Sequence, residues 1–218
     1  KYHADLKPLW DAFVIEAKNA TFLFQRDFME YHNDRFEDFS LMVYKNGKLI
    51  ALLPANKKDN IVYSHQGLSY GGVVYMKDVK FKDSLEAFES ILKYLKKSGY
   101  QKLYLNPIPQ FYNSKLSDEF SYFLFILEAK LRRRDTLSVI RYLDGHSLSK
   151  SRKEGVSRAQ KQGLEIKEVA GFDEFWNDIL IPNLKLKHKT KPVHSLQEIT
   201  KLKSHFPDNI RQFNVYKN

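Results

Sequence analysis

A four-residue repeat is the feature that most restricts how this chain can fold. Residues 43–46, VYKN, occur again as residues 215–218, where the 218-residue sequence ends. The same order of elements precedes both copies: a helix (8–18 with Trp10 and Phe13, or 172–180 with Phe175 and Trp176), a second helix, and a strand-like run. This pattern predicts two copies of one helix-helix-strand unit. Because the second copy stops inside its turn, with its last strand unpaired, we expect the natural protein to continue beyond Asn218.

The Asn46-Gly47 dipeptide predicts a β-hairpin, since these residues readily take the positive φ angles of a tight two-residue turn. Apolar alternation and breaker residues predict further elements. The predicted strands are 39–45, 48–55, 61–64, 73–76, 102–106 and 136–143. The predicted helices are 8–18, 26–32 and 84–98, with another from Ser117. Helices alternate with sheet segments, so the predicted class is α/β of the α+β kind.

A second unit is predicted to begin at residue 147. There the sequence changes to a basic helix, LSKSRKEGVSRAQKQG, which ends at Gly163 and is followed by the strand-like LEIKEV. A helix at 172–180, a basic loop at 183–194, a helix from Ser195 and a strand at 210–218 complete it. The predicted domains are therefore residues 1–146 and 147–218.

The charge balance favours anionic partners. Lys and Arg number 36 against 26 Asp and Glu, a net charge of +10, which suits phosphates, nucleotides or nucleic acid. The absence of cysteine excludes thiolate nucleophiles and thiolate zinc sites. The two histidines of the basic loop are six residues apart without a carboxylate nearby, so we predict no metal site. No apolar run approaches a membrane span and the first residues lack a signal sequence, so we predict a cytoplasmic protein.

The glycine-rich turn HQGLSYGG is the first candidate site. Residues 67–71 match G-x-S-x-G, the nucleophile elbow of serine hydrolases. An elbow needs a helix after the serine, whereas residues 73–76 read as a strand, so the match argues weakly for hydrolysis. A tight turn that faces a ligand is the favoured interpretation, because glycines let a substrate approach the backbone. The candidate substrate-binding residues of this turn are His65, Gln66, Ser69 and Tyr70.

A polar cluster ahead of the first hairpin is the second candidate. Its members are Arg26, Tyr31, His32, Arg35 and Asp38. One interpretation is a solvated helix end in which Asp38 pairs with Arg35. The other is acceptor binding, in which a guanidinium grips a phosphate and His32 acts as a general base. His32 and Asp38 are the weak catalytic candidates.

The basic helix of the second unit is the third candidate. Its lysines, with Ser157 among them, fall on one side: Lys150, Lys153 and Lys161. Val156 and Ala159 are predicted to face inward. Arg152 falls on the apolar side, where its charge would need an anion, so Arg152 and Lys153 are predicted to bind substrate. A solvated charged face and a surface for phosphate or tRNA remain the two alternatives.

Three segments resemble the FemAB-like branch of the GNAT acyltransferase superfamily, whose members have two tandem GNAT modules. They are FLFQRDFMEYHNDRFEDFSLMVYKNGKLIALLPA, the turn SHQGLSYGG, and RKEGVSRAQKQGLEIKEV. The resemblance implies a GNAT-like mixed, largely antiparallel sheet flanked by helices, plus the partial start of a second such module. It also implies a bacterial transferase acting on an amine of a cell-wall or surface-glycan precursor, which would be an anionic, nucleotide-linked acceptor. The donor would be an acyl-CoA or an aminoacyl-tRNA.

The first module departs from the GNAT pattern in one respect. It has no Q/R-x-x-G-x-G/A run, whose backbone N–H groups would hold a CoA pyrophosphate. We therefore expect this chain to bind no cofactor itself and to lack the donor site, so that residues 1–150 do not catalyse transfer alone. The competing hypothesis is a non-catalytic module that binds an acceptor, phosphate or nucleic acid, with tRNA as a candidate partner.

Overall fold

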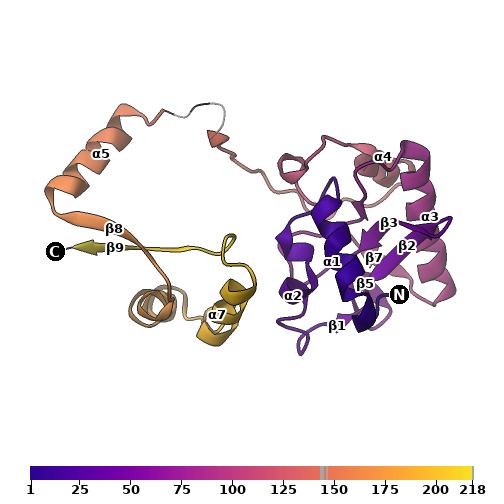
Figure 1. Cartoon of the computed structure of the whole chain (residues 1–218), viewed down its shortest axis with the longest axis horizontal. Helices are drawn as coiled ribbons and strands as arrows, with labels where there is room; N and C mark the ends of the chain where they lie inside the picture. The colour runs from indigo at the N-terminus through magenta and orange to yellow at the C-terminus, as the bar shows by residue number, and fades with distance from the viewer. Residues whose placement is uncertain (143–144, 146, 218) are drawn as a thin grey trace. The chain divides into compact units, whose positions relative to one another are not determined.

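The structure is a computed structural model that describes residues 1–142, 145 and 147–217 (Figure 1). The chain forms two compact units, Lys1–Ala129 and Lys130–Asn218. The predicted boundary after residue 146 lies at a residue outside the described ones, and it stays a prediction.

Two sheets form the centre of the first unit. One has the strand order β1-β4-β5-β7 and the other β2-β3-β6. Every pairing is antiparallel except β5 with β7, which is parallel. The strands are β1 (Glu37–Asp38), β2 (Leu41–Lys45), β3 (Lys48–Leu53), β4 (Asn56–Lys58), β5 (Ile61–Tyr63), β6 (Val74–Tyr75) and β7 (Lys102–Tyr104). The predicted mixed, largely antiparallel sheet is confirmed.

Helices cover both faces of strand β3. The helices of this unit are α1 (Lys7–Glu16), α2 (Arg26–Met29), α3 (Phe81–Lys97) and α4 (Glu119–Ile126), with short 3-10 turns at Ala4–Leu6, Phe22–Phe24 and Gln110–Tyr112. Ala51 and Leu53 belong to the core that α3 lines, whereas Leu52 between them belongs to the core that contains Trp10 of α1. Side chains alternate across a strand, so β3 is apolar from Leu49 to Leu53 and fills both cores.

The β2–β3 hairpin confirms the Asn-Gly prediction. Lys45 pairs with Lys48, and the two residues between them have φ angles of 49° at Asn46 and 76° at Gly47. Positive φ at both central positions is the turn that matches the twist of the two strands.

The second unit has its own core. Its elements are α5 (Lys150–Lys161), β8 (Leu164–Val169), a π-helix (Phe175–Leu180), α6 (Ile181–Asn183), a second π-helix (Leu184–His188), α7 (Leu196–His205) and β9 (Gln212–Lys217). The buried apolar side chains are Phe172, Trp176, Leu202 and Phe206. Strands β8 and β9 are antiparallel, with Ile166 opposite Val215. The strand predicted for the second VYKN copy is present as β9, although Asn218 is outside the described residues. The prediction that this strand is unpaired is wrong, because β9 pairs with β8 over its whole length.

Two predicted elements differ from the structure. Residues 136–141 form no strand, and Leu143 of that predicted strand lies outside the described residues. The first part of the predicted basic loop, Leu184–His188, is helical, and the helix ends at Lys189 with φ 50°. Both errors concern apolar or basic runs whose conformation depends on distant neighbours.

Candidate functional site

The glycine-rich turn of the first unit is held on both sides by neighbouring chain. Asn106 connects to it three times: its N–H donates to Ser64 Oγ at 3.1 Å, its side-chain amide donates to the Ser69 carbonyl, and its own carbonyl accepts from Gly71 N–H at 2.6 Å. On the other side, Gln66 exchanges two hydrogen bonds with the side chain of Asn56, at 2.8 and 2.9 Å. The turn is therefore a rigid platform, from which Gln66 and Ser69 are exposed.

Close packing explains the glycines of the G-x-S-x-G match. A methyl carbon added at Gly67 would lie 2.1 Å from His32 Nε2, and one added at Gly71 would lie 1.4 Å from the Ser64 carbonyl oxygen. After the turn the chain continues as strand β6, as expected, and not as the helix that a nucleophile elbow requires. The glycines thus serve the packing of the turn, and Ser69 has no elbow geometry.

Two histidines lie beneath this turn. The His32 and His65 rings stack with centroids 5.5 Å apart, and the side chains are 1% and 6% exposed. His32 Nε2 lies 3.2 Å from the Gly67 carbonyl oxygen, and His65 Nδ1 accepts a hydrogen bond from Gly67 N–H. Burial, and secondarily the adjacent His32, lower the pKa of His65 to about 4. The imidazole of His65 is therefore neutral at pH 7 and packs as part of the interior.

The lowered pKa of His65 predicts a loss of stability in mild acid. The unfolded chain takes up a proton at His65 near pH 6.5, whereas the folded chain does so only near pH 4. Stability therefore falls as the pH drops through this window, by roughly 3 kcal/mol at about 1.4 kcal/mol per pKa unit. Urea unfolding at pH 7 and pH 4 measures the loss. His65→Asn, which keeps an acceptor for Gly67 N–H, should show a smaller loss; an equal loss in both proteins would refute the assignment to His65.

Arg26 lies in the interior, at the meeting point of α2 with the start of the sheet. Its side chain is 2% exposed. The guanidinium donates to Glu30 at 2.8 Å and to Asp38 at 3.1 and 3.2 Å, and it lies 3.8 Å from the centroid of the Tyr2 ring. Asp38 also accepts a hydrogen bond from Ser40 Oγ at 2.7 Å. Arg26 and Asp38 therefore bind each other. This favours a structural role for both residues and argues against contact with a ligand.

Tyr31 and Arg35 form the accessible part of the predicted polar cluster. The Tyr31 ring stacks on His32 with centroids 4.2 Å apart, and the Arg35 guanidinium lies 5.5 Å from the Tyr31 ring centroid. Arg35 is exposed and Tyr31 is half-buried. Through the stacked pair His32 and His65, the predicted cluster is continuous with the glycine-rich turn. The structure thus brings the two predicted sites of the first unit together.

A small cleft next to this turn contains residues that the sequence did not single out. Its volume is about 50 Å³, and its wall includes the backbone of Gly71 and Gly72 and the side chains of Asn19 and Glu119. The side chain of Asn19 forms one hydrogen bond with strand β6 and one with the turn before that strand. Beside the cleft, buried Lys18 pairs with Glu119 at 2.6 Å, across 101 residues of sequence. The cleft has room for about one or two water molecules, so we do not regard it as a substrate site.

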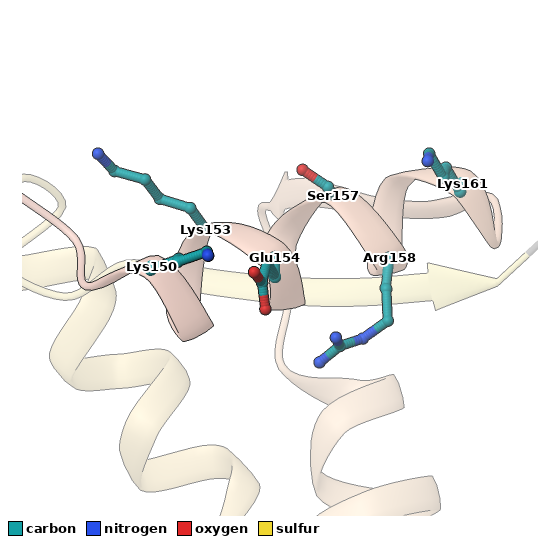
Figure 2. A pocket seen from close by; sticks show the side chains of 6 residues that line it. All are labelled: Lys150, Lys153, Glu154, Ser157, Arg158 and Lys161. Atoms are coloured by element: carbon teal, nitrogen blue, oxygen red, sulfur yellow. The ribbon is translucent and has the colours of Figure 1, made fainter.

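Helix α5 is the accessible candidate in the second unit. None of its residues is buried. One surface of the helix is lined by four cations, one carboxylate and a serine: Lys150, Lys153, Arg158, Lys161, Glu154 and Ser157. Lys153, Ser157 and Lys161 are spaced four apart and project from the same side of the helix (Figure 2). This is the predicted basic face, extended by Arg158.

Two predictions about α5 are corrected. Val156 was expected to face inward, but its side chain is 49% exposed. Arg152 was expected on a buried, apolar side, but it is also exposed, so its charge bears no burial cost. Of the two residues expected to face inward, Ala159 is half-buried and Val156 is exposed, so the helix has no buried face.

Two other features are missing from the part of the chain that the structure describes. No helix there is long and apolar enough to cross a membrane. No group of three metal-binding side chains is found among those residues.

Comparison with known proteins gives a fold but no sequence relative. No protein-family model and no curated protein matches the sequence. Among solved structures, the crystal structure of FemX matches 96% of this chain with a TM-score of 0.60 and 15% sequence identity. The chain has a FemX-like fold. It spans 56% of the length of FemX. The FemX-like fold agrees with the FemAB resemblance of the sequence, and at this identity the likeness concerns the fold alone.

Proposed function

We propose that this chain is part of an N-acyltransferase. The enzyme moves an acyl or aminoacyl group from acyl-CoA or aminoacyl-tRNA to an amine of a cell-wall or surface-glycan precursor. The observation that carries the proposal is the FemX-like transferase fold over 96% of the chain. The net charge of +10 suits donors and acceptors that carry phosphates. We place the reaction in the cytoplasm, where both kinds of donor are available.

The proposed chemistry needs no covalent enzyme intermediate. The amine nitrogen of the acceptor forms a bond to the carbonyl carbon of the donor, the ester or thioester bond breaks, and the amine loses a proton. The enzyme contributes by orienting the two substrates and by stabilising the negative charge on the carbonyl oxygen. A chain without cysteine, whose Ser69 lacks elbow geometry, is compatible with this direct attack.

Within this chain we assign the acceptor to the accessible rim of the histidine cluster. Gln66 and Ser69 are exposed on the rigid turn, and the exposed Arg35 has its guanidinium 5.5 Å from the Tyr31 ring centroid. An exposed guanidinium backed by an aromatic ring is suited to grip a phosphate of a nucleotide-linked acceptor. Buried His32 and half-buried Asp38 then position this rim, and the general base is contributed from elsewhere in the enzyme.

The alternative function is a nucleic-acid or phosphate-binding module without catalysis. The observation that favours it is the basic face of α5, where four cations surround one carboxylate. Both functions use this face, since an aminoacyl-tRNA donor and a regulatory RNA present the same phosphates. The two functions differ in whether the protein transfers an acyl group.

A transfer assay separates the two functions. The protein is incubated with an amine-bearing nucleotide-linked glycan precursor and either aminoacyl-tRNA or acyl-CoA, and the precursor is analysed by mass spectrometry. The proposal predicts a mass increase equal to one acyl or aminoacyl group, made by the protein that contains this chain and not by residues 1–150 alone. Steeply salt-dependent RNA binding without any transfer would support the binding module instead.

The role of α5 is tested by charge reversal. Lys153→Glu combined with Lys161→Glu should weaken binding of tRNA by about tenfold or more and lower the salt dependence, because each lost phosphate contact removes about one released counterion. The matched control is Lys93→Glu, an exposed lysine of α3. Filter binding across a salt series gives both quantities. Equal loss in the control, or unchanged binding in the double variant, would remove α5 from the binding surface.

A further inference from the structure

Two exposed aromatic rings lie next to each other in the short 3-10 turn Gln110–Tyr112 of the first unit. Phe111 and Tyr112 are 45% and 48% exposed, and their ring centroids are 4.4 Å apart. The Tyr112 ring also packs on Tyr70 with centroids 5.3 Å apart, so the two rings border the glycine-rich turn. We call Phe111 and Tyr112 the aromatic pair. Apolar side chains that lie together on a surface indicate a contact site, whereas single ones need no explanation.

The aromatic pair is held in place at both ends of its turn. At the start of the turn, Gln110 Nε2 donates a hydrogen bond to Asp118 Oδ1 at 2.7 Å. After the turn, Ser114 N–H donates to the carbonyl oxygen of the buried Lys18 at 2.8 Å. Phe111 belongs to neither hydrophobic core, so packing of the interior does not explain this ring. The pair is thus fixed before any ligand arrives, which lowers the entropy lost on binding.

The polar groups beside the aromatic pair are mainly uncharged. Gln110 and Asn113 flank the pair in the sequence, and both line the small cleft next to the glycine-rich turn, together with Ser117 and Ser121. Asn113 Oδ1 is buried and has no hydrogen-bond partner among the described residues, so it can accept a hydrogen bond from a ligand. The cleft, at about 50 Å³, has room for one hydroxyl group but not for a whole ring.

The charged groups near the aromatic pair disfavour an anionic ligand. Glu119 of the cleft binds Lys18 at 2.6 Å, and Lys115 lies 3.6 Å from Asp78. Asp118 is exposed, and among the described residues no cation pairs with it. An exposed carboxylate repels phosphate groups, but its oxygens readily accept hydrogen bonds from hydroxyl groups.

We propose that the aromatic pair binds a neutral sugar ring of the glycan acceptor. One face of a pyranose ring presents C–H groups, which pack against the electron-rich face of an aromatic ring. The hydroxyl groups at the edge of the sugar bind the amides and the carboxylate beside the pair, with one hydroxyl donating to Asn113 in the cleft. This inference rests on the proposed function, because it names the part of the acceptor that is held beside the glycine-rich turn.

A sugar fits this surface better than other ligands of aromatic rings do. A nucleobase stacks on the same rings, but its phosphates need cations, and the charge beside the pair that has no counter-ion is the carboxylate of Asp118. A protein partner in a stable complex covers roughly 800 Å² of each surface, which is far more than two half-exposed rings supply. A neutral ligand with many hydroxyl groups uses both the rings and the amides.

Saturation-transfer NMR tests the inference with the whole chain and chitotriose, a neutral trisaccharide of N-acetylglucosamine. We expect the strongest saturation at the axial protons of one sugar face, because that face lies on the rings. Phe111→Ala should weaken binding by about fivefold or more, since it removes one of the two rings. Phe111→Tyr keeps the ring and should bind as the wild-type protein does. The matched control is Tyr44→Ala, a tyrosine of β2 that is 47% exposed.

Four results would overturn the inference. They are the absence of chitotriose binding at millimolar concentration, equal binding by the Phe111→Ala protein, adenosine diphosphate binding that is tighter than that of chitotriose and is lost in Phe111→Ala, and a dimer in sedimentation velocity that Phe111→Ala dissociates. Chitotriose has no free amine, so its binding is measured independently of acyl transfer. Failure of transfer with intact, Phe111-dependent chitotriose binding would reject the proposed function and keep the sugar site. Transfer without chitotriose binding would do the reverse.

Discussion

Replacing Gly71 by alanine is expected to cost the first unit more than about 4 kcal/mol of folding free energy. The new methyl carbon would lie 1.4 Å from the carbonyl oxygen of Ser64. The backbone cannot move aside, because Gly71 donates to the Asn106 carbonyl and accepts from Ile108 N–H. A loss of this size is a large part of the roughly 5–15 kcal/mol that stabilises a typical domain. Urea unfolding followed by circular dichroism measures it.

Gly155 offers the same substitution without the clash. An added methyl group there has no heavy atom within 4 Å, and the residue lies inside helix α5. Gly155→Ala should therefore stabilise the second unit by about 0.5–1 kcal/mol, since alanine is the better helix former. If the Gly71→Ala protein unfolds at the same urea concentration as the wild-type protein, the close packing described for this turn is refuted.

Replacing Arg26 by methionine is expected to destabilise the first unit by roughly 3 kcal/mol. Methionine fills much of the volume but leaves Glu30 and Asp38 facing each other without the guanidinium that lies between them. Removal of one partner from a buried ion pair commonly costs about 3–5 kcal/mol, because the remaining charge is left uncompensated. The side chains of Glu30 and Asp38 are 38% and 32% exposed, so water compensates part of their charge and the expected loss lies at the lower end of that range. Arg26→Lys should lose less, since it keeps the charge but not the forked geometry.

Arg35→Met is the matched control for Arg26, because both arginines were predicted to bind the acceptor. Arg35 is exposed, so its loss should change the free energy of unfolding by no more than about 0.5 kcal/mol. Under the proposed function it should instead weaken binding of a nucleotide-linked acceptor, measured by calorimetry. A stable Arg26→Met protein with impaired acceptor binding would reverse the two roles.

The sequence predicted those parts of the fold that local signals determine. The Asn46-Gly47 turn requires two positive φ angles, and few other residue pairs take them readily. Helix α3 was recognisable from apolar residues at helical spacing and from Gly99, which has φ 84° beyond its end. Helix α7 begins with a capping box between Ser195 and Glu198, close to where the sequence placed it.

The candidate site was less predictable because burial of polar residues depends on distant chain. Arg26 reads as a surface residue of a short helix, and only the arrival of Tyr2 and Asp38 encloses it. The pairing of Lys18 with Glu119 has no local signal at all, since 101 residues separate them. The turn 65–72 was identified from its glycines, but the physical reason for them, close contact with His32 and Ser64, is visible only in the structure.

The sequence identified apolar segments but not the surfaces that pack against them. The run at 136–141 has the composition of a buried strand, yet Leu137, Val139 and Ile140 are 60%, 47% and 56% exposed. A pattern of apolar residues indicates that burial would stabilise a segment, but it does not indicate which surface of the protein covers that segment. The same limit applied to Val156 of α5.

The proposed transferase function depends on the FemX-like fold, so an experimental measurement of strand register tests it most directly. Nuclear Overhauser contacts in the isotope-labelled chain should link Ile166 with Val215 across β8 and β9, and Ala51 with Tyr75 across β3 and β6. The first pair tests the strand that ends the second VYKN copy, and the second tests the sheet between α1 and α3. Observation of both registers supports the fold. A helical or unpaired segment at Gln212–Lys217 would contradict the predicted duplication and, with it, the proposed reaction.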